Sequence, residues 1–281
     1  MPLFQQSVVK KYLNDLDKET LQQGWAAFTA HFHNSTIQQN ILTAKAEEYQ
    51  EGFVRDLFVT VLGYTLNPQP DYNFVLEKKT EADSTKSDGA IISPSLGGGA
   101  GGGHTIAVIE LKDTATTDLD KVEKQAFGYK HRHPDCTYII TANFQKLRFY
   151  INDAIEYEEF DLFTLTQDRF ALLYLCLSEQ TILKNIPLLI KKASLMQEEA
   201  VTKKLYSDYS GFRKKLFHNI AELNPQHTKI ELFQKTQKLL DRFLFILFAE
   251  DRMLLPPNSV RETLNFRFAK PWQEWPAGRP P

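Results

Sequence analysis

The sequence predicts a mixed α/β domain followed by an all-helical region, and three observations support this prediction. Apolar residues fall increasingly at helical spacing from Ile41 to Leu62, and Gly63 is placed to end that helix. Segments rich in β-forming residues, separated by turn residues, come next. Beyond Asp161 the apolar spacing is helical almost throughout. The order helix, three strands, helix, two strands is typical of a layered structure in which helices flank a mixed central sheet.

The expected strands lie on either side of a second helix. Three precede it, at residues 73–78, 90–92 and 105–112, and two follow it, at 137–141 and 147–151. The helix begins after Thr117 and repeats apolar residues on one face, namely Leu119, Val122, Ala126 and Tyr129. Later helices are expected at 170–177, 182–192, 198–223 and 229–254. We therefore expect two domains, residues 1–165 with the sheet and residues 166–281 with helices alone.

Composition and charge restrict the class of protein. Apolar residues make up 42% of the 281 residues and charged residues 24%, which is the balance of an ordinary globular protein. The net charge of -2 provides no overall attraction to nucleic acid, so DNA binding would require a local basic surface. The sequence shows neither a signal segment nor an apolar run long enough to span a membrane, so a cytoplasmic protein is expected. Cys136 and Cys176 lack any metal-ligand spacing and are expected to be buried free thiols.

The strand at residues 105–112 carries the first sign of chemistry. Its alternation places Glu110 and Lys112 on one face, the face that also carries Ile106 and Val108. Both faces are apolar until the end of the strand, which predicts burial on both sides. A carboxylate and an ammonium at the end of a buried strand would carry uncompensated charge unless a ligand binds there. A metal ion and a phosphate group would meet that need.

A second carboxylate is expected beside Glu110. Asp88 begins the preceding strand, and a hairpin through residues 93–104 would return the chain antiparallel, bringing Asp88 next to Glu110. Two carboxylates suit Mg²⁺, which keeps several waters and takes further oxygen ligands from a substrate phosphate. Lys112 could then orient a water molecule for in-line attack and stabilise the charge that develops on phosphorus. The alternative interpretation is a structural salt bridge.

A Glu-x-Lys tripeptide is by itself a weak signal, and the chain contains a second one. Pro70-Asp71 followed by Glu77-Lys78-Lys79 matches the motif more closely in its text. Six residues of extended chain would hold those two carboxylates roughly 20 Å apart, however, so they could not share a metal ion. We therefore assign the candidate site to Asp88, Glu110 and Lys112.

Residues 45–151 resemble the PD-(D/E)xK nuclease superfamily, in which Asp and Glu-x-Lys lie on adjacent central strands after a helix. The resemblance implies two further roles. Gln125 and Tyr129 look like the Gln-x-x-x-Tyr element of its exonuclease-like subgroup and would assist near the scissile phosphate, since a spacing of four places both on one helix face. A glutamate of the first helix, Glu48 or Glu51, would be a further metal ligand, and we favour Glu51. The alternatives are a core aromatic at Tyr129 and surface residues at Gln125 and Glu51.

The helical region narrows the resemblance. Leu239–Ile246, Ala249–Arg252 and Leu255-Pro256 are similar to the segment of type IIG restriction-modification enzymes that joins nuclease to methylase. This implies a Mg²⁺-dependent endonuclease acting on double-stranded DNA, whose parent protein also carries methylase and specificity domains. The chain has no Asn-Pro-Pro-aromatic motif and no methyl-donor loop, so S-adenosylmethionine binding would belong to the missing methylase. From the ending after Phe268 we expect either a fragment of a longer protein or a frameshifted product.

Basic residues around the expected cleft are candidates for DNA contacts, namely Lys78, Lys86, Lys130 and Arg132. Scattered surface cations are the alternative. Two other functions remain open for the chain as a whole. One is a catalytically inactive DNA-binding or assembly module of a restriction-modification system, and the other is a DNA repair exonuclease, which the Gln125 and Tyr129 pair would also suit.

Overall fold

The computed structural model describes residues 3–80, 83–93, 103–130, 135–259 and 261, with backbone only for 77–80 and 83–86. The chain forms two compact units, Met1–Gln197 and Glu198–Pro281. The sequence placed the division at residue 165 instead. The difference arises because the helices directly after the sheet contribute buried residues, Phe170, Leu173 and Ile182, to the core of the first unit.

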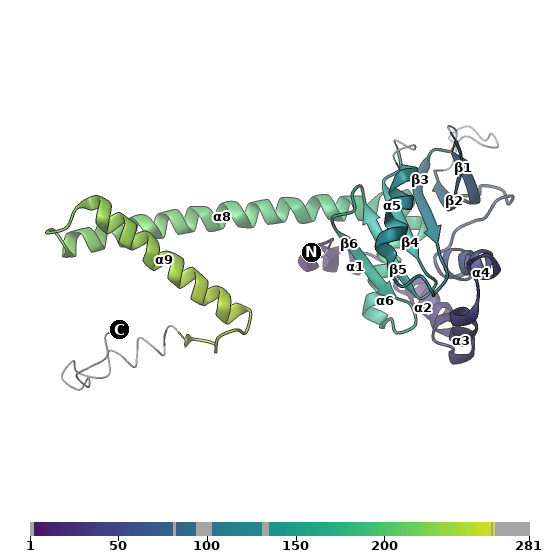
Figure 1. Cartoon of the computed structure of the whole chain (residues 1–281), viewed down its shortest axis with the longest axis horizontal. Coiled ribbons are helices and arrows are strands. Elements are labelled where there is room, and N and C mark those ends of the chain that lie inside the picture. Colours follow the sequence, from purple (N-terminus) through teal and green to yellow (C-terminus); the bar gives the residue numbers. More distant parts are fainter. Residues whose placement is uncertain (1–2, 81–82, 94–102, 131–134, 260, 262–281) are drawn as a thin grey trace. The chain divides into compact units, whose positions relative to one another are not determined.

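One mixed sheet organises the first unit, and this confirms the predicted α/β class (Figure 1). Among the described residues its six strands follow chain order, as β1 (Phe74–Thr80), β2 (Asp83–Ile92), β3 (Thr105–Leu111), β4 (Tyr138–Ala142), β5 (Lys146–Ile151) and β6 (Tyr157–Asp161). Neighbouring strands are antiparallel except β3 and β4, which are parallel. The helix α5 (Leu119–Lys130) makes that parallel connection and packs on β3 and β4.

The edge strand β6 was not predicted from the sequence. Its alternation is hidden because the two inward positions are Glu158 and Phe160, so only one of them is apolar. The buried Glu158 carboxylate is paired with Arg169 at 3.2 Å, and the Arg169 guanidinium also lies over the Phe160 ring. A buried charge with a partner is therefore compatible with a strand that sequence periodicity alone does not detect.

Helices cover the face of the sheet opposite α5. In the N-terminal part they are α1 (Gln6–Asn14), α2 (Lys18–Phe32), α3 (Ser35–Thr43), α4 (Ala46–Phe53) and the π-helix η1 (Val54–Val61). The single helix expected from Ile41 to Leu62 is thus interrupted after α3. Lys45 takes an extended conformation there, and its backbone N–H donates to the Glu48 carboxylate at 3.0 Å, which caps a new helix. Gly63 ends the segment as predicted, with φ at +85°.

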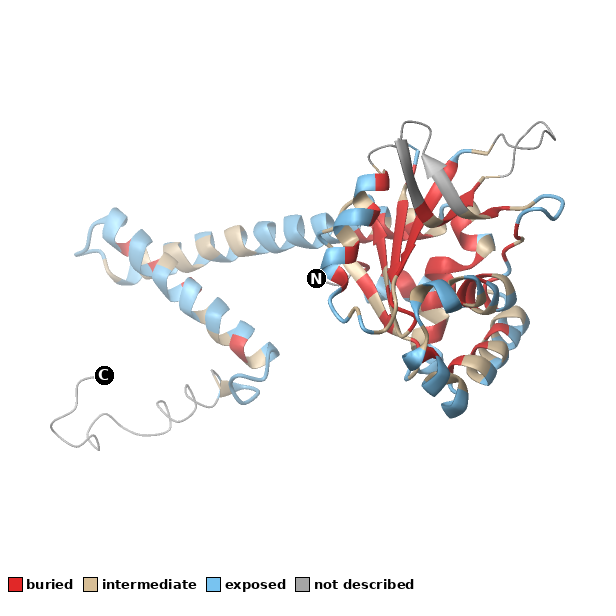
Figure 2. Ribbon diagram, turned by 45° about the vertical axis from the view of Figure 1, so that its right-hand side comes forward, coloured by how far each residue is buried: buried red, intermediate tan, exposed pale blue. Residues whose placement is uncertain are grey.

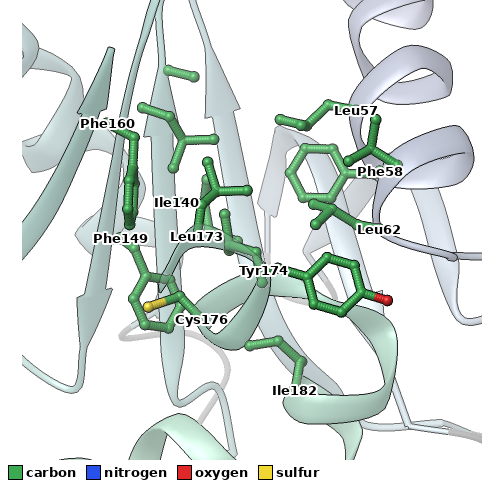
Figure 3. Packing of buried hydrophobic residues seen from close by; sticks show 14 of the residues in the cluster. Leu57, Phe58, Leu62, Ile140, Phe149, Phe160, Leu173, Tyr174, Cys176 and Ile182 are labelled. Carbon is green, nitrogen blue, oxygen red and sulfur yellow. The ribbon is translucent and has the colours of Figure 1, made fainter. Parts of the chain in front are cut away.

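A large aromatic and aliphatic core joins these helices to the sheet. Figure 2 shows the buried residues concentrated on the strands of the first unit. In Figure 3, Leu57 and Phe58 from η1 lie on one side of the core and Ile140 and Phe149 from the sheet on the other, with Leu173 next to Ile140. A smaller buried cluster lies on the α5 side and consists of Val108, Ala126, Tyr129, Cys136, Ile139 and Tyr150. The odd-numbered positions of β3, such as Ile109 and Leu111, point into the large core, and Val108 points toward α5.

The described part of the second unit is helical, as predicted. In the described residues after the sheet lie the helices α6 (Gln167–Leu177), α7 (Glu179–Leu183), α8 (Ile186–Leu223) and α9 (Lys229–Asp251). The second unit contains α8 from Glu198 onward and all of α9. Within it, Phe217 of α8 packs on Phe233 of α9 with ring centroids 5.8 Å apart. None of the helices in the described ranges combines the length and apolar character needed to cross a membrane.

Candidate functional site

The predicted hairpin brings Asp88 beside Glu110. β2 and β3 pair antiparallel with Gly89 opposite Ile109, so the next residues along each strand, Asp88 and Glu110, lie opposite each other. The backbone N–H of Leu111 donates to Asp88 Oδ2 at 2.7 Å, which fixes that carboxylate at the end of β3. Gly89 allows a close approach of Phe74, because a Cβ there would lie 3.1 Å from the Phe74 ring and the ring would have to shift. The Asp88 and Glu110 side chains therefore share one face of the sheet.

Glu110 is the most buried charged residue of the site, with 1% of its side chain exposed. Its Oε1 accepts a hydrogen bond from Lys112 Nζ at 2.7 Å. Its Oε2 is also buried and has no hydrogen-bond partner among the described residues. One oxygen of the carboxylate is thus held by Lys112, and the other is unsatisfied in a place that water does not reach freely.

The surroundings change the acid–base properties of this pair. Burial raises the pKa of Glu110 to about 7, and the negative charge of Asp88 adds to this, although the hydrogen bond from Lys112 and the nearby Gln125 amide oppose it. Burial alone would lower the pKa of Lys112, but its hydrogen bond and ion pair with Glu110 raise the pKa above the ordinary value. Lys112 therefore remains an ammonium group at neutral pH, beside two carboxyl groups that repel each other.

The helix α5 brings the two residues of the predicted Gln-x-x-x-Tyr element to this place. Gln125 Nε2 donates to the Tyr129 hydroxyl at 3.3 Å, as residues four apart on one helix face can. Tyr129 is buried in the cluster under α5, whereas Gln125 is exposed yet close enough to influence the pKa of Glu110. Gln125 thus lies at the solvent side of the site, and the Tyr129 ring fills space beneath it.

Glu51 is not brought into the site. It lies on α4, exposed, with Oε1 paired to Arg55 Nη2 at 2.8 Å one helical turn away. Phe53 of the same helix packs into the large core, on the opposite face of the sheet from Glu110. Among the described ranges no group of three or more His, Cys, Asp and Glu side chains is assembled to hold a metal ion. Glu51, expected as the third carboxylate of the metal site, is instead paired with Arg55 on the surface of the protein.

The charged groups of the site are therefore two carboxylates, which can bind a metal ion, and one ammonium group. Carboxylate oxygens are the ligands that Mg²⁺ prefers, and this ion commonly takes only one or two of them from the protein. The unsatisfied Glu110 Oε2 supplies an oxygen that a cation could bind without breaking an existing hydrogen bond. Asp88 and Glu110 fit Mg²⁺ because both are oxygen ligands and because Glu110 Oε2 has no hydrogen bond that the ion would have to replace. Mg²⁺ does not require a Cys or His ligand.

The predicted basic rim is only partly described. The side chains of Lys78 and Lys86, and the whole of Arg132, lie outside the described residues. Lys130 is described, and its Nζ donates to the backbone carbonyl of Asn152 in the turn between β5 and β6. Burial lowers the pKa of Lys130. This lysine holds the end of α5 against a turn, so its charge has a structural use.

Two polar groupings were not found by sequence reasoning. Thr141, the last but one residue of β4 as Glu110 is of β3, is fully buried, and its hydroxyl has no partner within the described ranges. The pattern Tyr-Ile-Ile-Thr-Ala offers a signal, because a small hydroxyl residue interrupts the apolar run near the end of the strand. Elsewhere, His31 contacts the Tyr49 hydroxyl at 2.7 Å and Asp56 at 3.2 Å, between α2, α4 and η1. Residues from three helices meet there, and their sequence spacing carries no signal.

The two cysteines match their prediction. Both are free and buried, and burial raises the pKa of Cys136 to about 11 and that of Cys176 well above its ordinary value.

Comparisons of the chain with protein-family models, with curated proteins and with solved structures give no match.

Proposed function

We propose that this chain is a Mg²⁺-dependent endonuclease that hydrolyses phosphodiester bonds of double-stranded DNA, as the nuclease part of a type IIG restriction-modification system. One observation carries the proposal. Glu110 is buried, bound through one oxygen to Lys112, unsatisfied at the other oxygen, and placed directly opposite Asp88. A structural salt bridge would not require a second carboxylate whose charge disfavours the first.

The strand arrangement supports the assignment to the PD-(D/E)xK fold. Helices precede three antiparallel strands, and α5 then leads to β4, which is parallel to β3. Asp88 and Glu110 lie on the two strands before α5, and Gln125 lies on α5 itself. The same order of elements was the basis for the resemblance in the sequence, and here the strand register adds the juxtaposition of the side chains.

Each residue has a role that its position allows. Asp88 and Glu110 would hold Mg²⁺, which supplies positive charge at the scissile phosphate when it is bound. Lys112, an ammonium one-third exposed, can donate to the attacking water or to a phosphate oxygen as charge develops in the transition state. The water oxygen would form the new bond to phosphorus and lose a proton to solvent, while the bond to the leaving oxygen breaks in line and that oxygen takes up a proton from solvent. Gln125, at the exposed side of the site, can donate to the DNA backbone.

The test is cleavage of covalently closed circular duplex DNA by the full chain in MgCl₂. Asp88→Asn, Glu110→Gln and Lys112→Met are each expected to lower the cleavage rate by about 100-fold or more. The matched control is Asp71→Asn. It neutralises an exposed carboxylate that belongs to the second, rejected Glu-x-Lys motif, and asparagine tolerates the positive φ of 54° at this position. This control should cut at the parent rate.

The outcomes separate the other candidate functions. A repair exonuclease would degrade linear duplexes and leave closed circles intact. An inactive DNA-binding or assembly module would cut neither, and calorimetry would show no Mg²⁺ binding that depends on Asp88. Variants at Asp88 and Glu110 that fold and cut circles at the parent rate would refute the proposed site. S-adenosylmethionine would have no effect on this chain, because methyl transfer is assigned to the methylase of the parent protein.

A further inference from the structure

Thr141 and Glu110 form a pair of unsatisfied buried oxygens. The side chain of Thr141 has none of its surface exposed, and neither Thr141 Oγ1 nor Glu110 Oε2 has a hydrogen-bond partner among the described residues. These are the two side-chain polar atoms in the described ranges that are buried and lack a partner. Most buried polar groups in folded proteins are paired, so two unpaired ones on neighbouring strands indicate a common cause.

The strand register places these two residues side by side. Glu110 of β3 is the direct partner of Thr141 in the parallel β3–β4 pair. The residues two positions earlier, Val108 and Ile139, are also direct partners and both lie in the cluster under α5. Since side chains alternate along a strand, Glu110 and Thr141 point to that same face. Neighbouring strands are about 4.8 Å apart, which is the span that one water molecule bridges between two oxygens.

The next residue in this row, Arg148, does not supply a hydrogen bond to Thr141. Thr141 pairs with Arg148 of β5, but the guanidinium of Arg148 is directed to Asp120 at 2.5 Å and to Glu159 at 2.6 Å. The strongest donor near Thr141 is therefore already bound to two carboxylates. The remaining polar neighbour in the row is Glu110, on the other side of Thr141.

We propose that Thr141 is a positioning residue of the Glu110 site, and that its hydroxyl and Glu110 Oε2 together hold one water molecule. The Thr141 hydroxyl donates to the water oxygen, and the water donates to Glu110 Oε2. This arrangement satisfies both oxygens and restrains the carboxylate in the rotamer that faces Asp88. The second part of the proposal rests on the proposed function: a restrained Glu110 binds Mg²⁺ more tightly, and the held water belongs with the waters that the ion retains.

The first test needs no metal ion. Unfolding in urea at pH 8 is followed by Trp25 fluorescence in a chain carrying Trp272→Phe and Trp275→Phe, because Trp25 packs on Phe170 inside the first unit. Thr141→Val keeps the shape of the side chain and removes the hydroxyl. It should raise the unfolding equilibrium constant about tenfold in the parent, since the held water and Glu110 lose a partner. In the Glu110→Gln background the effect should differ by about threefold or more, because the two residues share the water.

Thr141→Ser restores the hydroxyl and is the matched control. It should recover the coupling to Glu110, apart from a constant loss caused by the missing methyl group. The competing interpretation is a hydroxyl that points into dry, apolar surroundings. In that case Thr141→Val leaves the protein equally or more stable, by the same factor in both backgrounds, and the proposal is overturned.

The second test is calorimetric titration of the full chain with MgCl₂. Thr141→Val should weaken Mg²⁺ binding about tenfold, and Thr141→Ser should bind like the parent. Parent-like Mg²⁺ affinity in Thr141→Val, together with binding that Asp88→Asn abolishes, would overturn the role of Thr141 while the proposed function stands. Absence of Asp88-dependent binding in the parent would overturn the proposed function and the cation part of this inference, and the urea experiment would then decide the shared water alone.

Discussion

Replacing Glu110 by glutamine should stabilise the protein in the absence of divalent ions at pH 8. Burial and Asp88 raise the pKa of Glu110 from its ordinary 4.5 to about 7, so the folded protein binds this proton more tightly than the unfolded chain does. At pH 8 the parent must ionise Glu110 in unfavourable surroundings. Each pH unit between the two pKa values corresponds to about 1.4 kcal/mol, so the cost approaches about 3 kcal/mol. Glutamine has no proton to lose and avoids this cost.

The sign of the pH dependence follows from the same pKa values. Below about pH 4.5 the carboxyl group is protonated in both the folded and the unfolded protein, and the parent has its full stability. Between pH 4.5 and about 7 the unfolded chain releases the proton first, so the free energy of unfolding falls as pH rises. Above about pH 7 the loss is constant. The gain from Glu110→Gln should therefore be small at pH 4 and full at pH 8.

Urea unfolding followed by Trp25 fluorescence measures this difference in the first unit. Asp71→Asn is the control, and neutralising this exposed carboxylate should change the free energy of unfolding by less than about 0.5 kcal/mol. Adding MgCl₂ at about 100 times its Kd should stabilise the parent by about 2.7 kcal/mol and leave Glu110→Gln unchanged. A Glu110→Gln variant that is less stable than the parent at pH 8 would refute this account of the buried carboxylate. So would a gain in the free energy of unfolding that is equal at pH 4 and at pH 8.

Three further predictions follow from the described residues. Lys112→Met should lower the rate of DNA cleavage about 100-fold while Mg²⁺ still binds, and calorimetry showing lost binding instead would assign Lys112 to the metal site. Gly63→Ala should lower the free energy of unfolding by about 1 kcal/mol, because φ at this position is +85°. Gly128→Ala should raise the free energy of unfolding, because Gly128 lies in α5 with open space around it. Urea titrations of both variants measure these changes. Cys136 should react with a disulfide reagent far more slowly in the native than in the urea-unfolded protein, since burial raises its pKa to about 11; equal rates would contradict its burial.

The sequence was sufficient for the parts of the fold that obey local patterns. Alternating or continuous apolar residues located β3, β4 and β5, and Gly63 located the end of the first helical segment. The antiparallel pairing of β2 with β3 was also predicted, and it was enough to place Asp88 opposite Glu110. For this pair the register of one hairpin determined the geometry, so no tertiary information was needed.

The sequence was insufficient where tertiary contacts decide the outcome. β6 contains Glu158 at an inward position, and its pairing with Arg169, which lies on a later helix, cannot be read from the strand itself. The break before Lys45 depends on a cap formed by Glu48, which competes with a continuous apolar pattern. Glu51 was expected near the metal because a superfamily places a carboxylate on that helix, but Arg55 lies one turn away and pairs with it. Local ion pairs of this kind are invisible to motif matching.

Cleavage of closed circular duplex DNA in MgCl₂ by the parent and by Glu110→Gln tests the central claim most directly. Glu110→Gln is expected to gain stability and to lose cleavage activity, because the ionised carboxylate that destabilises the folded protein is the one assigned to bind the metal ion. The account predicts that Glu110→Gln is the more stable protein at pH 8 and does not cut, while the parent and Asp71→Asn cut at equal rates. A stable Glu110→Gln variant that cuts the circles at the parent rate would contradict the account.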